Sequence, residues 1–287
     1  MPPGIIDRKS HIGSKDIWID NTCLRLPRRI KALYSTDLAY IHDAGFNQFA
    51  ERASPEIARI LRRHGIRPSG NSRKPTRIVE VGCGGGTLAR HLVGEGYAVV
   101  GFDISPAMLQ LARAKVPAAI FRTRSLTDAR LPSCAAVVAI GEVIAYVPAG
   151  RGIELPPALR RFFVRVHAAL KPGGLLIFDF IESAARRTYE ARTKGGRGWV
   201  IAAHAEVDDR GRVLTRRLVT IRRIGRQYRR AQETHRVRIY TRSAVARALA
   251  AAGFTASMSR SYGRYRLMAG DVAVIARKQG RRSAAGL

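Results

Sequence analysis

The chain has 287 residues, a length that suits one large domain or a domain that carries an insertion. It contains no apolar run near the roughly 20 residues that span a bilayer, and its first residues lack the apolar core of a signal peptide, so we expect no membrane association. The formal net charge of +30 is typical of proteins with nucleic-acid partners, but the basic residues, mostly arginine, are spread along the whole chain instead of forming one patch. We therefore expect no specific nucleic-acid substrate.

The cysteine content predicts a reduced, metal-free protein. Cys23, Cys83 and Cys134 are odd in number, far apart and without the spacing of metal ligands. Free thiols of this kind are typical of cytosolic proteins, so the sequence predicts a cytoplasmic location.

Residues 1–75 are expected to form a helical segment and a linker ahead of the main domain. The pattern predicts a helix over 54–64, because Ser54 is a good N-cap, Pro55 suits the first turn and Gly65 follows the last residue. The polar stretch after this helix is typical of a link between segments.

The stretch from Arg77 to Asp103 predicts one β-α-β unit of a nucleotide-binding sheet. The β-branched residues of Arg77–Val81 predict a buried strand, Gly82–Gly86 predicts a tight turn, and 87–95 predicts a helix. Glycines let backbone N–H groups approach a ligand closely, and the helix that follows presents its positive dipole end. Asp103, at the carboxyl end of the second strand, is placed to accept hydrogen bonds from both hydroxyls of a ribose.

The glycine spacing argues against a dinucleotide site. That fingerprint needs a glycine at the sixth position counted from Gly82, where this chain has Thr87. The run Glu80-Val-Gly82-Cys-Gly84-Gly-Gly86 instead resembles the first motif of class I S-adenosylmethionine (SAM)-dependent methyltransferases, and Gly101-Phe-Asp103-Ile-Ser-Pro-Ala-Met108 resembles their second cofactor segment. The resemblance implies SAM as cofactor and a cofactor site that includes Glu80, Gly82, Cys83, Gly84, Gly86, Asp103, Ile104 and Met108.

The chain then predicts a helix over 106–115 and a third strand over 118–122. In the family that the chain resembles, the residues after this strand hold the adenine ring. The resemblance implies that role for Ser125 and Leu126, with Asp128 as an alternative contact for the adenine amino group.

A fourth strand is predicted over 134–140, which is apolar throughout, as expected inside a parallel sheet. Ligands of open α/β sheets bind outside the carboxyl ends of the strands, so Gly141, Glu142 and Tyr146 should border the cleft. Glu142 would lie near the methionine end of the cofactor and Tyr146 near the transferred methyl group; the alternative is a surface carboxylate and a packed tyrosine. By the same resemblance an N-terminal helical segment closes over the cofactor, which makes Tyr40 a candidate lid contact, although a tyrosine packed on the sheet fits as well.

A second motif, far from the glycine turn, supports the same family. An amphipathic helix is predicted over 157–170 and a fifth buried strand over 175–180. The run Leu170-Lys-Pro-Gly-Gly-Leu-Leu-Ile-Phe-Asp179 resembles the turn and strand that mark these methyltransferases. The resemblance therefore covers about residues 77–181.

The residues after the fifth strand change to a period of two, which is typical of antiparallel strands. A polar link is predicted over Thr193–Gly198. Three long strands are predicted after it, over Trp199–Val207, Arg212–Ile224 and Gln227–Tyr240.

Histidines on these strands are the candidate catalytic residues. Alternation puts Glu233 and His235 on one face of the third strand, and His204 and Glu206 on one face of the first. Methyl transfer to a protonated amine or a hydroxyl needs a group that takes the proton, and histidine titrates near neutral pH. We name His235 as a candidate base with His204 behind it, and Tyr146 beside the methyl group; the alternative is a structural histidine bonded to Glu233, with catalysis by alignment alone.

An Ala-rich helix and two closing strands over 256–262 and 271–277 complete the predicted fold. That fold is an α/β, Rossmann-like, mostly parallel seven-stranded sheet flanked by helices, with an antiparallel β insert after the fifth strand. The predicted domains are 1–75 (lid segment and linker), 76–192 (SAM-binding core), 193–240 (insert) and 241–287 (C-terminal helix, closing strands and basic tail).

The resemblance implies a SAM-dependent methyltransferase that acts on a nitrogen or oxygen of a small molecule. Its insert resembles those of small-molecule N-methyltransferases, including enzymes that act on amino sugars, where it forms a substrate roof, a dimer contact or both. A homodimer through the insert is therefore one of the arrangements that the resemblance implies. The alternatives are an RNA or protein methyltransferase, which needs a basic face leading to the cleft, and a non-catalytic SAM-binding subunit, whose cleft the insert would plug.

Overall fold

The computed structural model describes residues 33–69, 74–146, 155–183 and 188–279. Cys23, the first 32 residues of the predicted lid segment and the predicted tail from residue 280 lie outside these ranges. Within the described ranges, no helix is long and apolar enough to cross a membrane.

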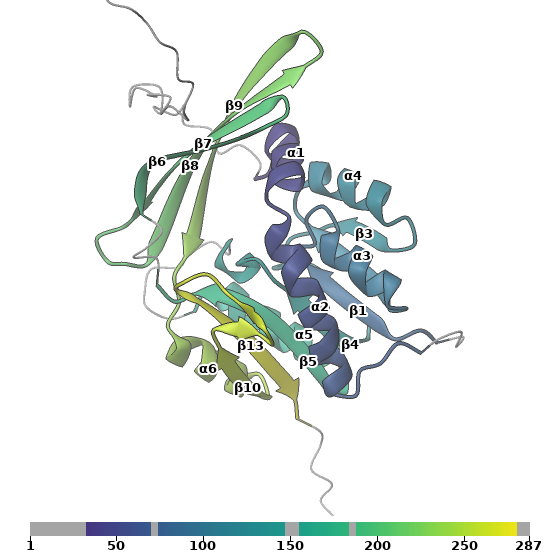
Figure 1. Ribbon diagram of the computed structural model, residues 1–287. Coiled ribbons are helices and arrows are strands. Elements are labelled where there is room, and N and C mark those ends of the chain that lie inside the picture. The colour runs from purple at the N-terminus through teal and green to yellow at the C-terminus, as the bar shows by residue number, and fades with distance from the viewer. Residues whose placement is uncertain (1–32, 70–73, 147–154, 184–187, 280–287) are drawn as a thin grey trace, which may run out of the picture.

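The central element is a seven-stranded sheet in the order β10-β13-β5-β4-β1-β2-β3 (Figure 1). Neighbouring strands from β3 to β5 run parallel, and β13 is antiparallel to both β5 and β10. The strands are β1 (Arg77–Val81), β2 (Ala98–Asp103), β3 (Ile120–Thr123), β4 (Cys134–Ala139), β5 (Leu170–Ile181), β10 (Phe254–Ser259) and β13 (Asp271–Lys278). The predicted mostly parallel, Rossmann-like sheet is confirmed.

Helices cover both faces of this sheet because its strands are apolar on both sides. In β1, Ile78 packs into the cluster beneath α2, α3 and α4, whereas Val79 packs into the cluster beneath α5 and α6. The helices are α1 (Thr36–Gly45), α2 (Gln48–Arg63), α3 (Thr87–Gly94), α4 (Pro106–Lys115), the short 3-10 helix η2 (Val143–Tyr146), α5 (Pro157–Ala169) and α6 (Arg242–Ala251).

The helix predicted from Ser54 begins earlier, at Gln48. Ser54 is not its N-cap: the Ser54 hydroxyl donates to the Ala50 carbonyl oxygen at 2.5 Å, and Pro55 lies inside the helix. A proline in that position removes one intrahelical hydrogen bond and costs about 3 kcal/mol. The helix continues because its apolar face, which includes the fully buried Ile57, packs against the sheet on both sides of the proline.

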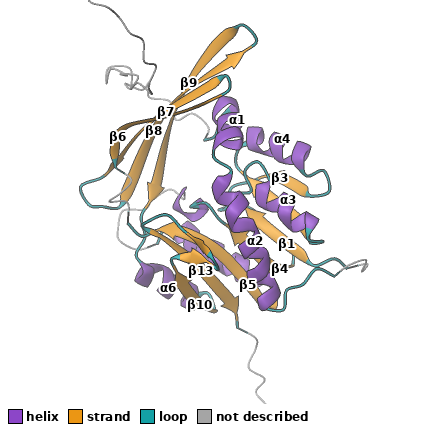
Figure 2. Ribbon diagram, viewed as in Figure 1, coloured by secondary structure: helices purple, strands orange, loops and turns teal. Residues whose placement is uncertain are grey.

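The insert is a separate antiparallel sheet in the order β6-β7-β8-β9 (Figure 2). Its strands are β6 (Tyr189–Gly196), β7 (Trp199–Val207), β8 (Val213–Ile224) and β9 (Gln227–Arg238). The three long strands are confirmed, but the link predicted over Thr193–Gly198 is wrong, because most of it belongs to β6. This strand is polar and exposed since it is an edge strand, paired with β7.

A short hairpin of β11 (Ser261–Tyr262) and β12 (Tyr265–Arg266) lies between β10 and β13. The pattern predicts one strand through residue 262, whereas β10 ends at Ser259. The hairpin turns Tyr262 into the core, where its side chain is fully buried.

Helix α1 joins the insert to the main domain, and it lies between the insert and α4 (Figure 1). Leu38 and Ile41 pack on Trp199 and Ile201 of β7. The buried Asp37 carboxylate binds the guanidinium groups of two arginines, on β8 and β9, at 3.4 and 2.6 Å. Helix α1 and the insert therefore form one packed unit.

Candidate active site

The loop between β1 and α3 allows a ligand to approach closely. Gly82, Gly84 and Gly86 have left-handed φ angles of 70°, 51° and 78°, which glycine adopts at no steric cost. A Cβ atom at Gly82 would overlap Val143, whereas one at Gly84 would meet no atom of the described residues within 4 Å. The loop is therefore tightly packed where it starts and open at Gly84.

Asp103 ends β2, one strand away from this loop. Its Oδ2 accepts the Gly84 N–H at 2.9 Å and its Oδ1 accepts the Ser105 N–H at 2.8 Å. Burial raises the pKa of Asp103, and these backbone hydrogen bonds lower it in part. Each oxygen keeps further acceptor capacity, so the carboxylate can accept hydrogen bonds from two neighbouring hydroxyls.

Glu80 is a second acid beside the loop. Its carboxyl is buried, and its Oε2 has no hydrogen-bond partner among the described residues. Burial raises its pKa to about 8, helped by the nearby charge of Asp103. A buried oxygen without a partner, close to an open glycine loop, fits a ligand with N–H or O–H donors such as SAM.

Three further predicted cofactor residues differ in accessibility. Ile104 is 42% exposed, whereas Met108 and Cys83 are buried. Burial raises the pKa of the Cys83 thiol well above its usual value, and a Cβ atom at Gly101 would lie 2.9 Å from its sulfur. A neutral, enclosed thiol acts as a small packing residue and not as a nucleophile.

The predicted adenine contacts lie in a short turn after β3. The Ser125 hydroxyl lies 2.6 Å from that of Thr127 and donates to the Asp128 carboxylate. Leu126 packs into the core beneath α5. An open pocket beside the turn is lined in part by Phe102 and Asp128. The turn therefore offers polar atoms to a ligand, while the side chain of Leu126 belongs to the core.

The turn after β4 is strained and carries an ion pair. Gly141 and Glu142 have φ angles of 84° and 65°, and the left-handed conformation costs a non-glycine residue about 1–2 kcal/mol. The Glu142 carboxylate pairs with Arg216 of β8 at 2.9 Å. This pair connects the carboxyl edge of the main sheet to the insert.

Four side chains meet above this edge: Tyr34, Tyr146, Glu233 and His235, which we call the phenol–imidazole cluster. Glu233 Oε2 lies 2.9 Å from His235 Nε2. The Tyr146 hydroxyl lies 3.5 Å from His235 Nδ1 and 3.4 Å from the Tyr34 hydroxyl. The Tyr34 carbonyl oxygen accepts the Ser105 hydroxyl at 2.7 Å, which places the cluster beside the carboxyl end of β2.

Burial and hydrogen bonds together determine the protonation of Tyr34, Tyr146 and Glu233. Burial raises the pKa of Tyr34 and of Tyr146, so both phenols stay protonated at neutral pH. Burial also opposes the charge of Glu233, but hydrogen bonds from His235 and Ser35 outweigh it and lower the pKa of Glu233. The cluster therefore has a carboxylate at one end, two neutral hydroxyls at the other, and His235 between them.

The structure brings His235 and Tyr146 together but places His204 elsewhere. In the strand register, His204 is opposite Arg217, and Arg217 is opposite Thr234. Residues directly opposite one another share a face of a sheet, so His204 lies on the face of the insert away from His235. Its Nδ1 lies 3.3 Å from Arg217 Nη1.

Tyr40 lies in α1, and the Arg222 guanidinium stacks over its ring at 3.6 Å. It therefore connects α1 to the insert, whereas Tyr34, which precedes α1, is the tyrosine that belongs to the cluster. Tyr34 and Arg216 are site residues that the sequence patterns missed. Tyr34 directly precedes Ser35, the N-cap position of α1, and this position next to a helix start is a sequence signal that could have identified it. Arg216 is one arginine among many, so no sequence signal distinguishes it.

Polar contacts hold both ends of α1 in place. Asp43, near its end, pairs with a lysine of α4 at 2.6 Å, and a Cβ atom at Gly85 would overlap the Asp43 carboxylate. At its start, the N–H groups of Tyr34 and Ser35 donate to the Glu233 carboxylate at 2.7 and 2.8 Å. The helix thus covers the glycine loop at one end and holds the cluster at the other.

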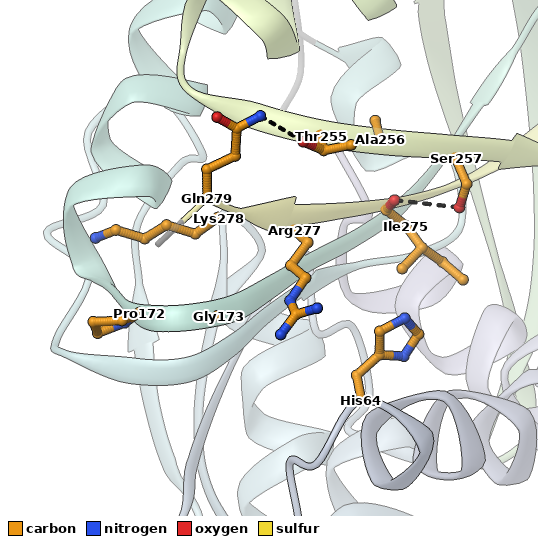
Figure 3. A pocket seen from close by; sticks show the side chains of 10 residues that line it. All are labelled: His64, Pro172, Gly173, Thr255, Ala256, Ser257, Ile275, Arg277, Lys278 and Gln279. Carbon is orange, nitrogen blue, oxygen red and sulfur yellow. Dashed lines mark hydrogen bonds between the residues drawn. The ribbon is translucent and has the colours of Figure 1, made fainter. Parts of the chain in front are cut away.

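A larger pocket lies at the opposite end of the main sheet, where β13 pairs with the start of β5 (Figure 3). His64, Gly173 and Arg277 contribute to its lining, which includes no predicted site residue. Within the described part of the chain, no group of three histidine, cysteine or acidic side chains is placed to hold a metal ion. The carboxyl edge of the sheet is therefore the candidate site.

Comparisons with known proteins agree with this geometry. A family model described as a methyltransferase domain matches residues 48–257. A dTDP-3-amino-3,6-dideoxy-α-D-glucopyranose N,N-dimethyltransferase of Streptomyces fradiae is 29% identical over 238 residues, covering 78% of this chain and 86% of that enzyme. A ubiquinone biosynthesis O-methyltransferase of Methylobacterium sp. is 31% identical over 150 residues, covering 52% of this chain and 53% of the relative.

The solved structure of a SAM-bound amino pentose methyltransferase from Micromonospora echinaspora is similar to this chain, with a TM-score of 0.65 at 18% identity. The aligned region covers 88% of this chain and 100% of the M. echinaspora chain. This likeness confirms the fold. Together with the glycine loop and the acid that ends β2, the family match leads to one conclusion: the chain belongs to the methyltransferase domain family and is a class I SAM-dependent methyltransferase.

Proposed function

We propose that this enzyme transfers the methyl group of SAM to an amine nitrogen of a small molecule of the amino-sugar class. The observation that carries the proposal is the phenol–imidazole cluster, which is enclosed by the lid helix on one side and the insert on the other. An enclosed site suits a compact acceptor better than a polymer. The relative from S. fradiae, whose name describes an amino-sugar N,N-dimethyltransferase, supports the same acceptor class.

For the cofactor, we propose that the backbone N–H groups of Gly82–Gly86 and the Asp103 carboxylate hold the adenosyl part. Asp103 is the acceptor for the ribose hydroxyls, because both of its oxygens are fixed by the backbone and keep lone pairs. Glu80 is the buried acceptor for a donor group, and Ser125 contributes to the adenine side. SAM supplies an electrophilic methyl group on a sulfonium.

The chain's own residues then act on the acceptor. An amine attacks only as the free base, so the proton of an ammonium group must leave. In this proposal the Tyr146 hydroxyl orients the amine and passes the proton to His235 Nδ1, while Glu233 stabilises the resulting imidazolium. His235 is 1% exposed and so acts through Tyr146 and not by direct contact with the acceptor. Alignment of the two reactants supplies the larger part of the rate.

Arg216 and Glu142 support this end of the site. The Arg216 charge lowers the pKa of both Tyr34 and Tyr146, against the dominant effect of burial. The ion pair with Glu142 holds Arg216 beside the phenols.

A hydroxyl acceptor is the second candidate, favoured by the O-methyltransferase relative. The same cluster could take a hydroxyl proton, so the two candidates differ in substrate and not in site.

We also propose a homodimer through the insert: Ile221 and Tyr228 are 39% and 70% exposed and share its outer face. Light scattering of wild type and Tyr228→Glu tests it, with a dimer expected only for wild type.

The test of the main proposal is a methyl-transfer assay with SAM, read by mass spectrometry, over paired acceptors that differ only in an amine or a hydroxyl at one position. We expect methylation of the amino sugars and none of the hydroxyl partners. Methylation of the hydroxyl partners alone would establish the second candidate. Tyr146→Phe should lose activity. Tyr97→Phe should keep it, because Tyr97 is a buried tyrosine just before β2, far from the carboxyl end of that strand.

A further inference from the structure

Within the described ranges, two residues other than glycine have a left-handed backbone: Tyr34 (φ 52°) and Glu142 (φ 65°). Both border the active site, one from the lid and one from the turn after β4. Each has its N–H bound by a buried carboxylate, since Glu233 Oε2 accepts the Tyr34 N–H at 2.7 Å and Asp179 Oδ1 accepts the Glu142 N–H at 2.5 Å. Such conformations cost about 1–3 kcal/mol each and persist where the surroundings hold them.

Asp179 takes no part in the proposed cofactor contacts or in the proposed proton transfer. It lies at the carboxyl end of β5 and is 2% exposed. Its Oδ2 accepts the Gly141 N–H at 2.8 Å and the Tyr262 hydroxyl at 2.9 Å. Three donors therefore converge on one buried carboxylate, and two of them are consecutive peptide N–H groups of the same turn. Burial raises the pKa of Asp179 to about 7, although the two backbone hydrogen bonds lower it in part. Above that pH the carboxylate is ionised, and hydrogen bonds to an ionised acceptor are strong, so this arrangement fixes both peptide planes.

The turn that Asp179 holds contacts both halves of the site. Val143, the next residue, fills the space where a Cβ atom of Gly82 would lie. The Glu142 side chain reaches the insert, where it pairs with Arg216 at 2.9 Å. A rotation of the Glu142 peptide would therefore displace a contact with the cofactor loop and the ion pair with the insert together.

We propose that Asp179 is a positioning residue for methyl transfer: it holds the Gly141–Glu142 turn in its left-handed conformation, and so sets Val143 on the glycine loop and Glu142 on Arg216. Tyr262 orients the carboxylate from the hairpin between β10 and β13. The inference rests on the proposed cofactor site at the glycine loop. It assigns Asp179 no contact with SAM itself.

The test is SAM affinity, measured by titration calorimetry on full-length variants, with thermal unfolding as a second readout. Asp179→Asn keeps the size of the side chain but replaces one acceptor oxygen by an N–H donor that faces a backbone N–H. We expect SAM to bind about tenfold more weakly. In a Glu142→Gly background the same change should cost only about twofold, because glycine adopts the left-handed conformation at no steric cost.

This comparison separates positioning from a general role in the core. If Asp179 only stabilised the core, Asp179→Asn would weaken SAM binding equally in the Glu142 and the Glu142→Gly backgrounds, and that result would overturn the proposal. Unchanged affinity in a folded Asp179→Asn variant would overturn it as well. Wild-type protein that binds no SAM would remove the cofactor site and this role together, whereas wild-type binding with an unaffected variant removes the role alone.

If Asp179→Asn does not fold, two milder variants test whether Asp179 positions the turn. Tyr262→Phe removes one hydroxyl from the carboxylate and should weaken SAM binding about threefold. The matched control is Tyr97→Phe, because Tyr97 is also buried and its hydroxyl donates to the Ile66 carbonyl oxygen at 2.7 Å, at the other end of the sheet. Equal SAM affinities for the two variants would overturn the proposal.

Discussion

Asp103→Asn isolates the contribution of one charge to cofactor binding, because asparagine has the size of aspartate and keeps one oxygen. In the structure the backbone already holds both oxygens of Asp103, with N–H groups from Gly84 at 2.9 Å and from Ser105 at 2.8 Å. The amide nitrogen that replaces one oxygen cannot accept a hydrogen bond. One backbone donor therefore loses its partner, and one ribose hydroxyl loses the acceptor that we propose for it.

The expected loss of affinity follows from these contacts. A hydrogen bond to a charged group contributes about 1.5–3 kcal/mol, and each ~1.4 kcal/mol changes a binding constant tenfold. We therefore expect SAM to bind roughly 10- to 100-fold more weakly. Stability should change much less, because burial raises the pKa of Asp103 and the neutral amide avoids the cost of holding a buried charge.

Titration calorimetry with SAM and S-adenosylhomocysteine measures the affinity, and urea denaturation measures the stability. Asp209→Asn, on the exposed turn between β7 and β8, is the matched control and should bind both compounds as the wild type does. A folded Asp103→Asn variant whose SAM affinity stays within about twofold of wild type would refute the reasoning, because a charged hydrogen bond contributes more than that.

Three further changes test other parts of the site. Burial raises the pKa of Glu80 from 4.5 to about 8. The neutral Glu80 carboxyl therefore stabilises the folded state fully below pH 4.5, and this contribution is lost as the pH rises toward 8. Glu80→Gln should show a flatter decline of the unfolding free energy over that pH range in urea titrations. Asp37→Asn should lower the unfolding free energy by about 1–2 kcal/mol at pH 7, less than for a fully buried pair because the Arg229 partner is half exposed. Tyr146→Phe should lower kcat about tenfold or more in a methyl-release assay, with SAM affinity unchanged.

Each of these changes has an outcome that contradicts its premise. If Glu80→Gln has the same pH dependence as wild type, the Glu80 carboxyl does not titrate in this range. If Asp37→Asn is as stable as wild type, the ion pairs between the lid and the insert do not contribute to folding. If Tyr146→Phe keeps its kcat, alignment alone accounts for catalysis and the phenol has no part in proton transfer.

Short-range patterns were sufficient for the main sheet and the glycine loop. Glycine spacing, alternation and the acid that ends β2 all act within one β-α-β unit, where the backbone preferences of neighbouring residues decide the geometry. The start of α4 is an example: the helix predicted over 106–115 is present, and the Ser105 hydroxyl caps it by accepting the Met108 N–H at 3.1 Å. The same local rules failed at Pro55 and over Thr193–Gly198, where packing of an apolar face and pairing with β7 outweighed the preferences of single residues.

The sequence by itself therefore determined the fold class, the glycine loop and the acid at Asp103, because each depends on contacts between residues close together in the chain. Only the tertiary structure decided which side chains meet across the site. His204 and His235 carry the same signal in the sequence, yet the strand register puts them on opposite faces of the insert. Tyr146 contacts residues that are 112 positions before it and 89 positions after it. Contacts of that range depend on how the lid, the insert and the main sheet pack together, which no short stretch of sequence specifies.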